Sequence, residues 1–161
     1  MTIIAEPSLP TATVSRPGRR LRIIVNSVAS DSHTWNLVYL PLLMEGMGHR
    51  VRNLGACVPD ELLVAECRRQ RPDLVVVSSV NGHGHVQGTR LIRQLCACDE
   101  LRGVPVVIGG KLGVAGLGGD HYADGLMAAG FAAVFAGDAD ADVDDFSADV
   151  RSLSVQMAVG W

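Results

Sequence analysis

The sequence LRIIV at residues 21–25 and the loop SDSHTWN at residues 30–36 decide the fold that we expect for this chain. The apolar run predicts a buried strand, and the run LVYLPLL at residues 37–43 predicts a helix after the loop. Open α/β sheets bind their ligands at such strand-to-helix loops. This loop carries His33, with Asp31 two residues before it. A neutral imidazole is a common metal ligand, and a carboxylate can fix its orientation, so the loop is a candidate metal site.

Both residues also have an ordinary interpretation. A histidine in a loop is more often solvated than bound to a metal, and Asp31 is placed where a carboxylate caps the following helix. The metal hypothesis therefore depends on what other loops contribute.

Alternating strands and helices fill the rest of the chain. We expect strands at residues 21–27, 50–55, 73–79, 103–108 and 130–135, and helices at residues 36–46, 58–70, 86–96, 121–129 and 137–153. Residues 73–79 form a continuous apolar run that is typical of a central parallel strand, whereas residues 50–55 are short and alternating, as at an edge. Pro41 is expected to distort the first helix. The pattern predicts a flavodoxin-like (Rossmann-like) α/β fold, a five-stranded parallel sheet in the order 2-1-3-4-5 with helices on both faces.

The composition is that of one globular domain. The chain has 161 residues, of which 48% are hydrophobic and only 4% aromatic, so the core is expected to consist of aliphatic side chains. We expect a disordered tail at residues 1–20, the domain at residues 21–155 and a C-terminal tail at residues 156–161.

The charge and the cysteine content argue against several classes of partner, metal site and compartment. The net charge of −3 gives no case for a nucleic-acid partner, and no apolar run is long enough to span a membrane. The N-terminus has no convincing secretory signal. The four cysteines fit no zinc-binding spacing, so we expect reduced thiols in a cytoplasmic protein.

Three loops of unusual composition are expected side by side at the carboxyl edge of the sheet, after the first, third and fourth strands. The third strand ends in Ser78 and Ser79, which either cap local backbone or donate a hydrogen bond to a ligand. Gly109-Gly110 after the fourth strand forms either a tight turn or a place where a bulky ligand approaches the backbone. No phosphate-binding glycine motif is present, and the acidic cluster and lysine of a response regulator are missing.

These loops resemble the motifs of cobalamin-binding domains. Asp31-Ser32-His33-Thr34-Trp35-Asn36, Ser78-Ser79-Val80 and Gly109-Gly110 are similar to Asp-x-His-x-x-Gly, Ser-x-Leu and Gly-Gly, and the likeness extends over residues 22–150. Residues 30–33, 53–55, 59–62 and 77–84 most resemble the small (sigma) subunits of glutamate mutase, also called methylaspartate mutase. Two positions depart from the pattern, because Asn36 stands in place of glycine and Val80 in place of leucine.

The resemblance implies how cobalamin would bind. Its dimethylbenzimidazole base would leave the cobalt and enter a slot beside the sheet, and His33 would become the axial cobalt ligand. Asp31 would hydrogen-bond the other imidazole nitrogen, Ser78 would bond the base, and Gly109-Gly110 would leave room for it. Asn36 is expected to affect affinity. The cofactor-binding residues implied are Ser30, Asp31, Ser32, His33, Thr34, Trp35, Asn36, Ser78, Val80, Gly82, Gly109, Gly110 and Lys111.

The function implied is that of one subunit of an isomerase. The chain would hold adenosylcobalamin for the radical rearrangement of glutamate to 3-methylaspartate, whereas a separate large (epsilon-like) barrel subunit would bind the amino-acid substrate. The chain would be inactive alone and would carry no catalytic residue.

Two alternatives remain open. The chain could be a corrinoid carrier for methyl transfer, although such carriers usually have a helical domain that the short stretch before Leu21 does not supply. It could also be a non-catalytic cobalamin sensor or a relative that has lost the cofactor. A neighbouring gene for a large barrel subunit or for a methyltransferase would discriminate between the first two functions. His83 and His85 are expected to be solvated.

Overall fold

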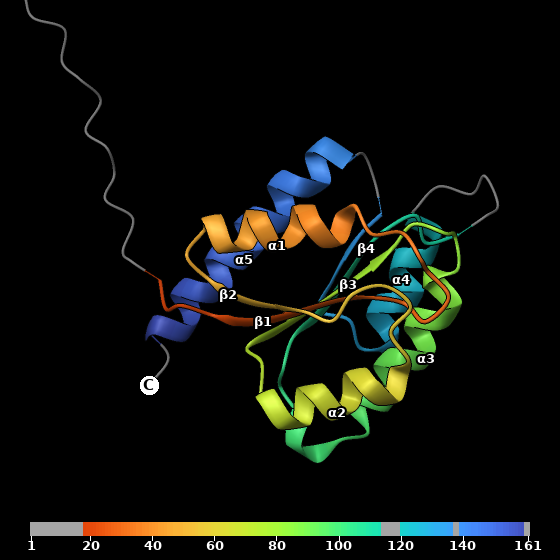
Figure 1. Ribbon diagram of the computed structural model, residues 1–161, viewed down its shortest axis with the longest axis horizontal. Coiled ribbons are helices and arrows are strands. Elements are labelled where there is room, and N and C mark those ends of the chain that lie inside the picture. The colour runs from red at the N-terminus through yellow and green to blue at the C-terminus, as the bar shows by residue number, and fades with distance from the viewer. Residues whose placement is uncertain (1–17, 114–119, 137–138, 160–161) are drawn as a thin grey trace, which may run out of the picture.

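The computed structural model describes residues 18–113, 120–136 and 139–159. Its centre is one parallel sheet in the order β2-β1-β3-β4-β5 (Figure 1). The strands are β1 (Arg22–Ser27), β2 (Arg50–Asn53), β3 (Leu74–Ser79), β4 (Val106–Gly110) and β5 (Ala133–Phe135). The flavodoxin-like fold predicted from the sequence is confirmed, with β2 at an edge and β3 at the centre.

Helices cover both faces of the sheet (Figure 1). One layer consists of α1 (Asn36–Gly46) and α5 (Ala139–Val159). The other consists of α2 (Asp60–Gln70), α3 (Gly84–Cys96) and α4 (Asp120–Ala129), with the short 3-10 helix η1 (Asp99–Leu101) after α3. No helix in the described part of the chain combines the length and the apolar character needed to cross a membrane.

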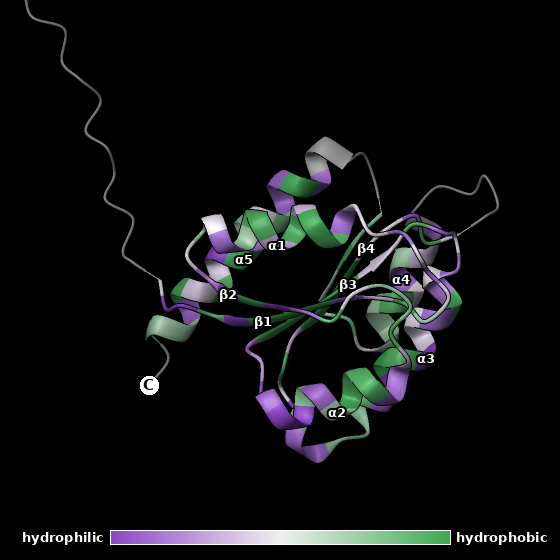
Figure 2. Cartoon of the chain, in the orientation of Figure 1, coloured by the Kyte–Doolittle hydropathy of each residue, from purple (hydrophilic) through white to green (hydrophobic). Residues whose placement is uncertain are grey.

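The strands separate two hydrophobic cores because successive side chains point to opposite faces of a sheet. In β3, Val75 and Val77 belong to the core under α2, α3 and α4, whereas Leu74 and Val76 belong to the core under α1 and α5. Each fully buried side chain of this kind contributes about 1.5–3 kcal/mol. Figure 2 shows the central strands as hydrophobic between the helix layers, with hydrophilic residues on outer helices such as α2. The same alternation places Ser78 on the α1–α5 face.

Several boundaries differ from those expected. The third helix begins at residue 84 rather than 86, the second strand ends at 53 rather than 55, and the last two strands begin at 106 and 133 rather than 103 and 130. Gly55 and Gly130 both have positive φ, which takes the backbone out of strand geometry at these ends.

The last helix continues to Val159, past the expected end at residue 153, because Leu153 and Met157 still pack against the core under α1 and α5. Residues 156–159 are therefore helical, although the sequence predicted a tail there. Residues 18–20 lie against this helix, since Arg19 N–H donates to Ser154 O (3.1 Å) and Ser154 Oγ donates to Arg19 O (2.7 Å). The rest of the expected N-terminal tail, residues 1–17, lies outside the described residues, and the division of the chain into tails and domain stays a prediction.

Pro41 does not interrupt α1, which is one continuous helix from Asn36 to Gly46. Proline lacks the N–H that would bond to the carbonyl four residues earlier, here that of Leu37. The side chain of Asn53 replaces it, because its Nδ2 donates to Leu37 O at 2.5 Å. Asn53 Oδ1 also accepts from Gly55 N–H (2.9 Å), so one amide ties α1 to the end of β2.

We expect Asn53→Ala to lower the free energy of unfolding by about 1–3 kcal/mol, because it leaves the Leu37 carbonyl without a partner. In a Pro41→Ala background the helix itself supplies that N–H, so Asn53→Ala should cost about 1 kcal/mol less. Urea unfolding of the two single variants and the double variant measures this coupling. Equal costs in both backgrounds would contradict the assigned role of Asn53.

Candidate functional site

The loops after β1, β3 and β4 meet at the carboxyl edge of the sheet, as expected from the sequence. Backbone bonds join them: Val28 N–H donates to Ser78 O (3.3 Å), and Gly82 N–H donates to Lys111 O (3.2 Å). Gly82 is buried and has a φ of 86°, which suits a residue without a Cβ. The three loops therefore form one continuous rim, which we call the loop cluster (residues 28–35, 80–83 and 111–113).

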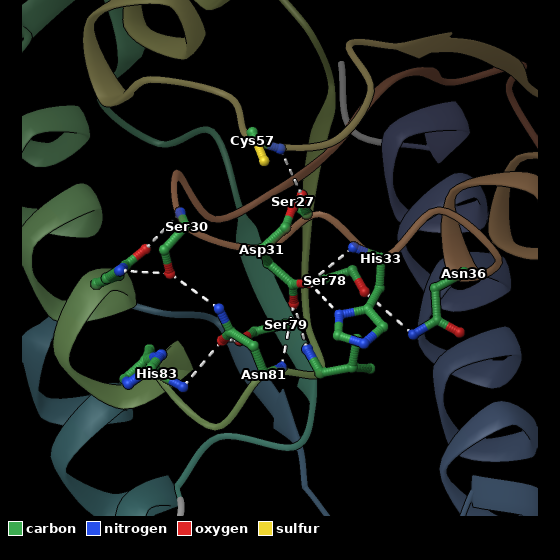
Figure 3. A network of polar contacts seen from close by, with 12 residues as sticks. Ser27, Ser30, Asp31, His33, Asn36, Cys57, Ser78, Ser79, Asn81 and His83 are labelled. Carbon is green, nitrogen blue, oxygen red and sulfur yellow. Dashed lines mark hydrogen bonds and ion pairs between the residues drawn. The ribbon is translucent and has the colours of Figure 1, made fainter.

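Asp31 holds two of these loops together (Figure 3). Its side chain is 1% exposed. Oδ2 accepts from the backbone N–H groups of Val80 (2.6 Å) and Asn81 (3.3 Å), and Oδ1 accepts from His33 N–H (3.0 Å) and His33 Nδ1 (2.7 Å). Burial raises the pKa of this carboxyl, but the hydrogen bonds, that from Val80 first, outweigh it and hold the pKa below its ordinary value of 3.8. Asp31 is therefore a carboxylate at neutral pH and not the cap of α1.

His33 presents one ring nitrogen to the outside. Its side chain is 56% exposed, and its Nδ1 is engaged by the Asp31 carboxylate. Because a carboxylate accepts hydrogen bonds, Nδ1 carries a proton, and in the neutral ring Nε2 is then the nitrogen with the lone pair. This is the arrangement in which a carboxylate orients a metal-binding imidazole. Among the described residues no three metal-ligating side chains gather, so His33 is a single candidate ligand.

A polar network supports the loop around Asp31 (Figure 3). Ser30 Oγ accepts from Asn81 Nδ2 (2.8 Å) and Gln87 Nε2 (2.7 Å), and Ser30 N–H donates to Gln87 Oε1 (3.1 Å). Asn81 Oδ1 accepts from His83 N–H (3.0 Å). Asn81 and Gln87 were not anticipated from the sequence as site residues. The Asn-Gly pair at residues 81–82 was a usable signal for a turn, whereas nothing in the sequence singled out Gln87.

An apolar groove of about 420 Å³ lies beside the loop cluster, between α1 and α5 and over the ends of β3, β4 and β5. Seven of the expected site residues line it: Trp35, Asn36, Ser78, Val80, Gly109, Gly110 and Lys111. The other six, Ser30, Asp31, Ser32, His33, Thr34 and Gly82, belong to the loop cluster and do not line the groove. Ser32 and Thr34 are exposed there.

The floor of the groove combines the hydroxyl of Ser78 with a glycine, Gly109, at the neighbouring position in the sheet. Ser78 is 4% exposed, and its Oγ accepts a hydrogen bond from Asn36 Nδ2 at 3.2 Å. Gly109 lies in β4, where it pairs with Ser78 of β3 on one side and with Phe135 of β5 on the other. A Cβ on Gly109 would lie 3.1 Å from Phe135 O, so a larger residue would crowd this part of the groove. The groove therefore suits a flat group that approaches the backbone closely.

Gly110 has a different reason for being glycine. Its φ is 108°, and a Cβ there would overlap the carbonyl oxygen of Ser79. Each of the two alternatives left open for Gly109-Gly110 applies to one residue. Gly110 is required by the backbone conformation, whereas Gly109 leaves space for a ligand in the groove.

Several groove residues were not anticipated from the sequence. Phe135 and Phe146 pack edge to face, with ring centroids 5.6 Å apart, and form one wall with Val143. Strand alternation would have placed Val76 and Val107 on the face of Ser78 and Gly109, but no sequence signal identified Phe146 in α5. His83 is exposed, as expected, whereas His85 is partly buried against the ring of Tyr122, at 4.8 Å between centroids.

We expect Asp31→Asn to lower the free energy of unfolding by about 2–4 kcal/mol, because an amide presents a donor to groups that all donate. The exposed neighbour provides the control, and Ser32→Ala should change stability by about 0.5 kcal/mol or less. Urea unfolding of both variants tests the role of Asp31, which is wrong if the two variants unfold alike.

Comparison with known proteins gives consistent matches. Residues 21–141 match the family described as B12 binding domain. The glutamate mutase sigma subunit of Treponema denticola is 25% identical over 117 residues, which is 73% of this chain and 84% of that protein. The glutamate mutase sigma subunit of Fusobacterium nucleatum is 30% identical over 94 residues, which is 57% of this chain and 67% of that protein.

Solved structures agree on the fold. A cobalamin-binding protein from Desulfitobacterium hafniense has a TM-score of 0.65 at 18% identity, over 83% of this chain and 59% of its own. The monomethylamine corrinoid protein of Methanosarcina barkeri has a TM-score of 0.62 at 18% identity, over 80% of this chain and 57% of its own. The present chain thus spans less than two thirds of these two proteins. A response regulator from Chloroflexus aurantiacus has a TM-score of 0.60 at 14% identity over 84% of this chain and 98% of its own, so these likenesses concern the fold alone.

Proposed function

Because the chain belongs to the B12-binding domain family and is homologous to glutamate mutase sigma subunits, we propose that it is the cobalamin-binding subunit of an adenosylcobalamin-dependent mutase. Family membership confirms the resemblance drawn from the three motifs. The observation that carries the proposal is the exposed imidazole of His33, whose Nδ1 is held by the buried carboxylate of Asp31 beside the groove of Ser78 and Gly109.

His33 is the proposed axial cobalt ligand. Because the corrin ring would itself supply ligands to the cobalt, one imidazole from the protein would be sufficient. The hydrogen bond between Nδ1 and Asp31 fixes the orientation of the ring and leaves Nε2 available for the cobalt. The bonds from Val80 and Asn81 keep Asp31 charged and in place.

The groove is the proposed site of the nucleotide tail that leaves the cobalt. Its volume, about 420 Å³, falls in the range of small-molecule sites. Trp35, Phe135 and Phe146 supply apolar walls for a flat base, and Ser78 supplies a polar group at the floor. The corrin ring would then lie over the loop cluster, against Ser30, Ser32, Thr34 and Gly82.

A separate large barrel subunit is the proposed partner, and it would bind the amino-acid substrate. When bound, adenosylcobalamin supplies a weak cobalt–carbon bond whose cleavage starts a radical rearrangement. The present chain holds the cofactor and excludes its tail from solvent, and it is inactive alone. We place this function in the cytoplasm, where free thiols such as those of Cys57 and Cys96 remain reduced.

Titration of the full chain with cobalamin tests the cofactor and the ligand together. Binding should change the absorption spectrum as the tail base leaves the cobalt. The electron paramagnetic resonance signal of the cobalt(II) form should show a hyperfine splitting from the ligand nitrogen, and this splitting should change when the protein is labelled with the heavy isotope of nitrogen. His33→Ala should remove that splitting and weaken binding by about tenfold to a hundredfold or more.

His121→Ala is the matched control, because it removes an exposed histidine of α4 that belongs to neither the loop cluster nor the groove, and it should leave both readouts unchanged. A protein-derived splitting that survives in His33→Ala would exclude His33 as the ligand. Failure of the folded wild-type chain to bind cobalamin would reject the proposed function.

The reaction itself is tested by reconstitution. The chain with adenosylcobalamin alone should convert no glutamate, whereas addition of a large barrel subunit of glutamate mutase should produce 3-methylaspartate, measured by proton magnetic resonance. Transfer of a methyl group to an added acceptor, with no rearrangement of glutamate, would instead favour a corrinoid carrier.

A further inference from the structure

The hydrogen-bonded pair of Asn36 and Ser78 gives the groove a property that a lone serine would not have. Asn36 is the first residue of α1 and is half-buried, and Ser78 is buried at the end of β3. Their side chains meet at 3.2 Å, and both line the groove. Figure 3 shows the Asn36 amide with its nitrogen toward Ser78 and its oxygen on the opposite side.

The pair offers a guest both a donor and an acceptor. A carboxamide and a hydroxyl each donate and accept, and one donor and one acceptor are used between them. With one Asn36 Nδ2–H donating to Ser78, the second Nδ2–H, the Ser78 hydroxyl proton and the Asn36 carbonyl oxygen remain for a guest. No described residue donates to that oxygen. If the amide is turned over, both Asn36 N–H groups and the Ser78 oxygen remain, so the pair still presents at least one donor and one acceptor.

The apolar surroundings of the pair increase the cost of leaving its donor or its acceptor without a hydrogen bond. The groove walls next to the pair are apolar, being formed by Trp35, Phe135 and Phe146, and Gly109 leaves the space beside Ser78 open. A polar group that a guest covers without bonding to it loses its contact with water and gains nothing in return. A base with a single ring-nitrogen acceptor satisfies only the donor of the pair.

We infer that the Asn36–Ser78 pair makes the groove selective for a corrinoid whose tail base carries a donor beside an acceptor. An aminopurine such as adenine has this edge, whereas dimethylbenzimidazole does not. The inference rests on the proposed function, because it concerns the base that the same groove would hold.

The test compares two corrinoids that differ only in the tail base, one with dimethylbenzimidazole and one with adenine, by absorbance titration of the full chain. The wild-type chain should bind the adenine form more tightly. Asn36→Gly leaves a hydroxyl that can rotate to suit either base, so the ratio of the two dissociation constants should shift by about tenfold or more toward dimethylbenzimidazole. Asn36→Ala, which keeps the helix start, should shift it in the same direction.

The matched control is Val38→Ala, which removes an exposed side chain from the same helix outside the groove and should leave the ratio unchanged. The ratio cancels any general loss of folded protein, because that loss affects both titrations equally. An unchanged ratio in both Asn36 variants overturns the inference and leaves the proposed function standing. Binding of neither corrinoid to the folded chain rejects the proposed function itself.

Discussion

The buried carboxylate of Asp31 is the contact on which the loop cluster depends. Its two oxygens receive hydrogen bonds from two loops that are about fifty residues apart in sequence, through His33 on one side and Val80 and Asn81 on the other. Burying a charge is costly unless donors surround it, and here four donors do so. The result is an imidazole with a fixed orientation on an exposed loop, which a solvated carboxylate would not provide.

The groove depends on a second constraint, the alternation of side chains along parallel strands. Because successive residues within each strand point to opposite faces of the sheet, every second residue faces α1 and α5. These residues are Val76 and Ser78 in β3 and Val107 and Gly109 in β4. On the face that α1 and α5 cover, each strand therefore has an apolar residue followed, near its end, by a polar or small one: Ser78 supplies a hydroxyl and Gly109 leaves space. The loop cluster and the groove are adjacent because both begin where the same strands end.

The fold was predictable because its evidence is local. Apolar runs, helix periodicity and glycines at element ends identified, in order, the five strands and five α-helices of the described residues, and the short polar strand β2 was correctly assigned to an edge. The errors lie at boundaries, as in α5, where packing of Met157 extends the helix beyond its sequence signal. The integrity of α1 around Pro41 was not predictable either, because its missing hydrogen bond is replaced by Asn53 from another element.

By itself, the sequence determined the order of strands and helices, the presence of Asp31, His33, Ser78 and Gly109 at loops and strand ends that meet at one edge, and the family to which these motifs belong. Only the tertiary structure decided how these residues are used. It set Asp31 against the backbone of a distant loop, joined Asn36 to Ser78, and brought Phe146 of α5 into the groove wall. These contacts join residues far apart in the chain, and their distances follow from the packing of whole elements, which no local sequence pattern encodes.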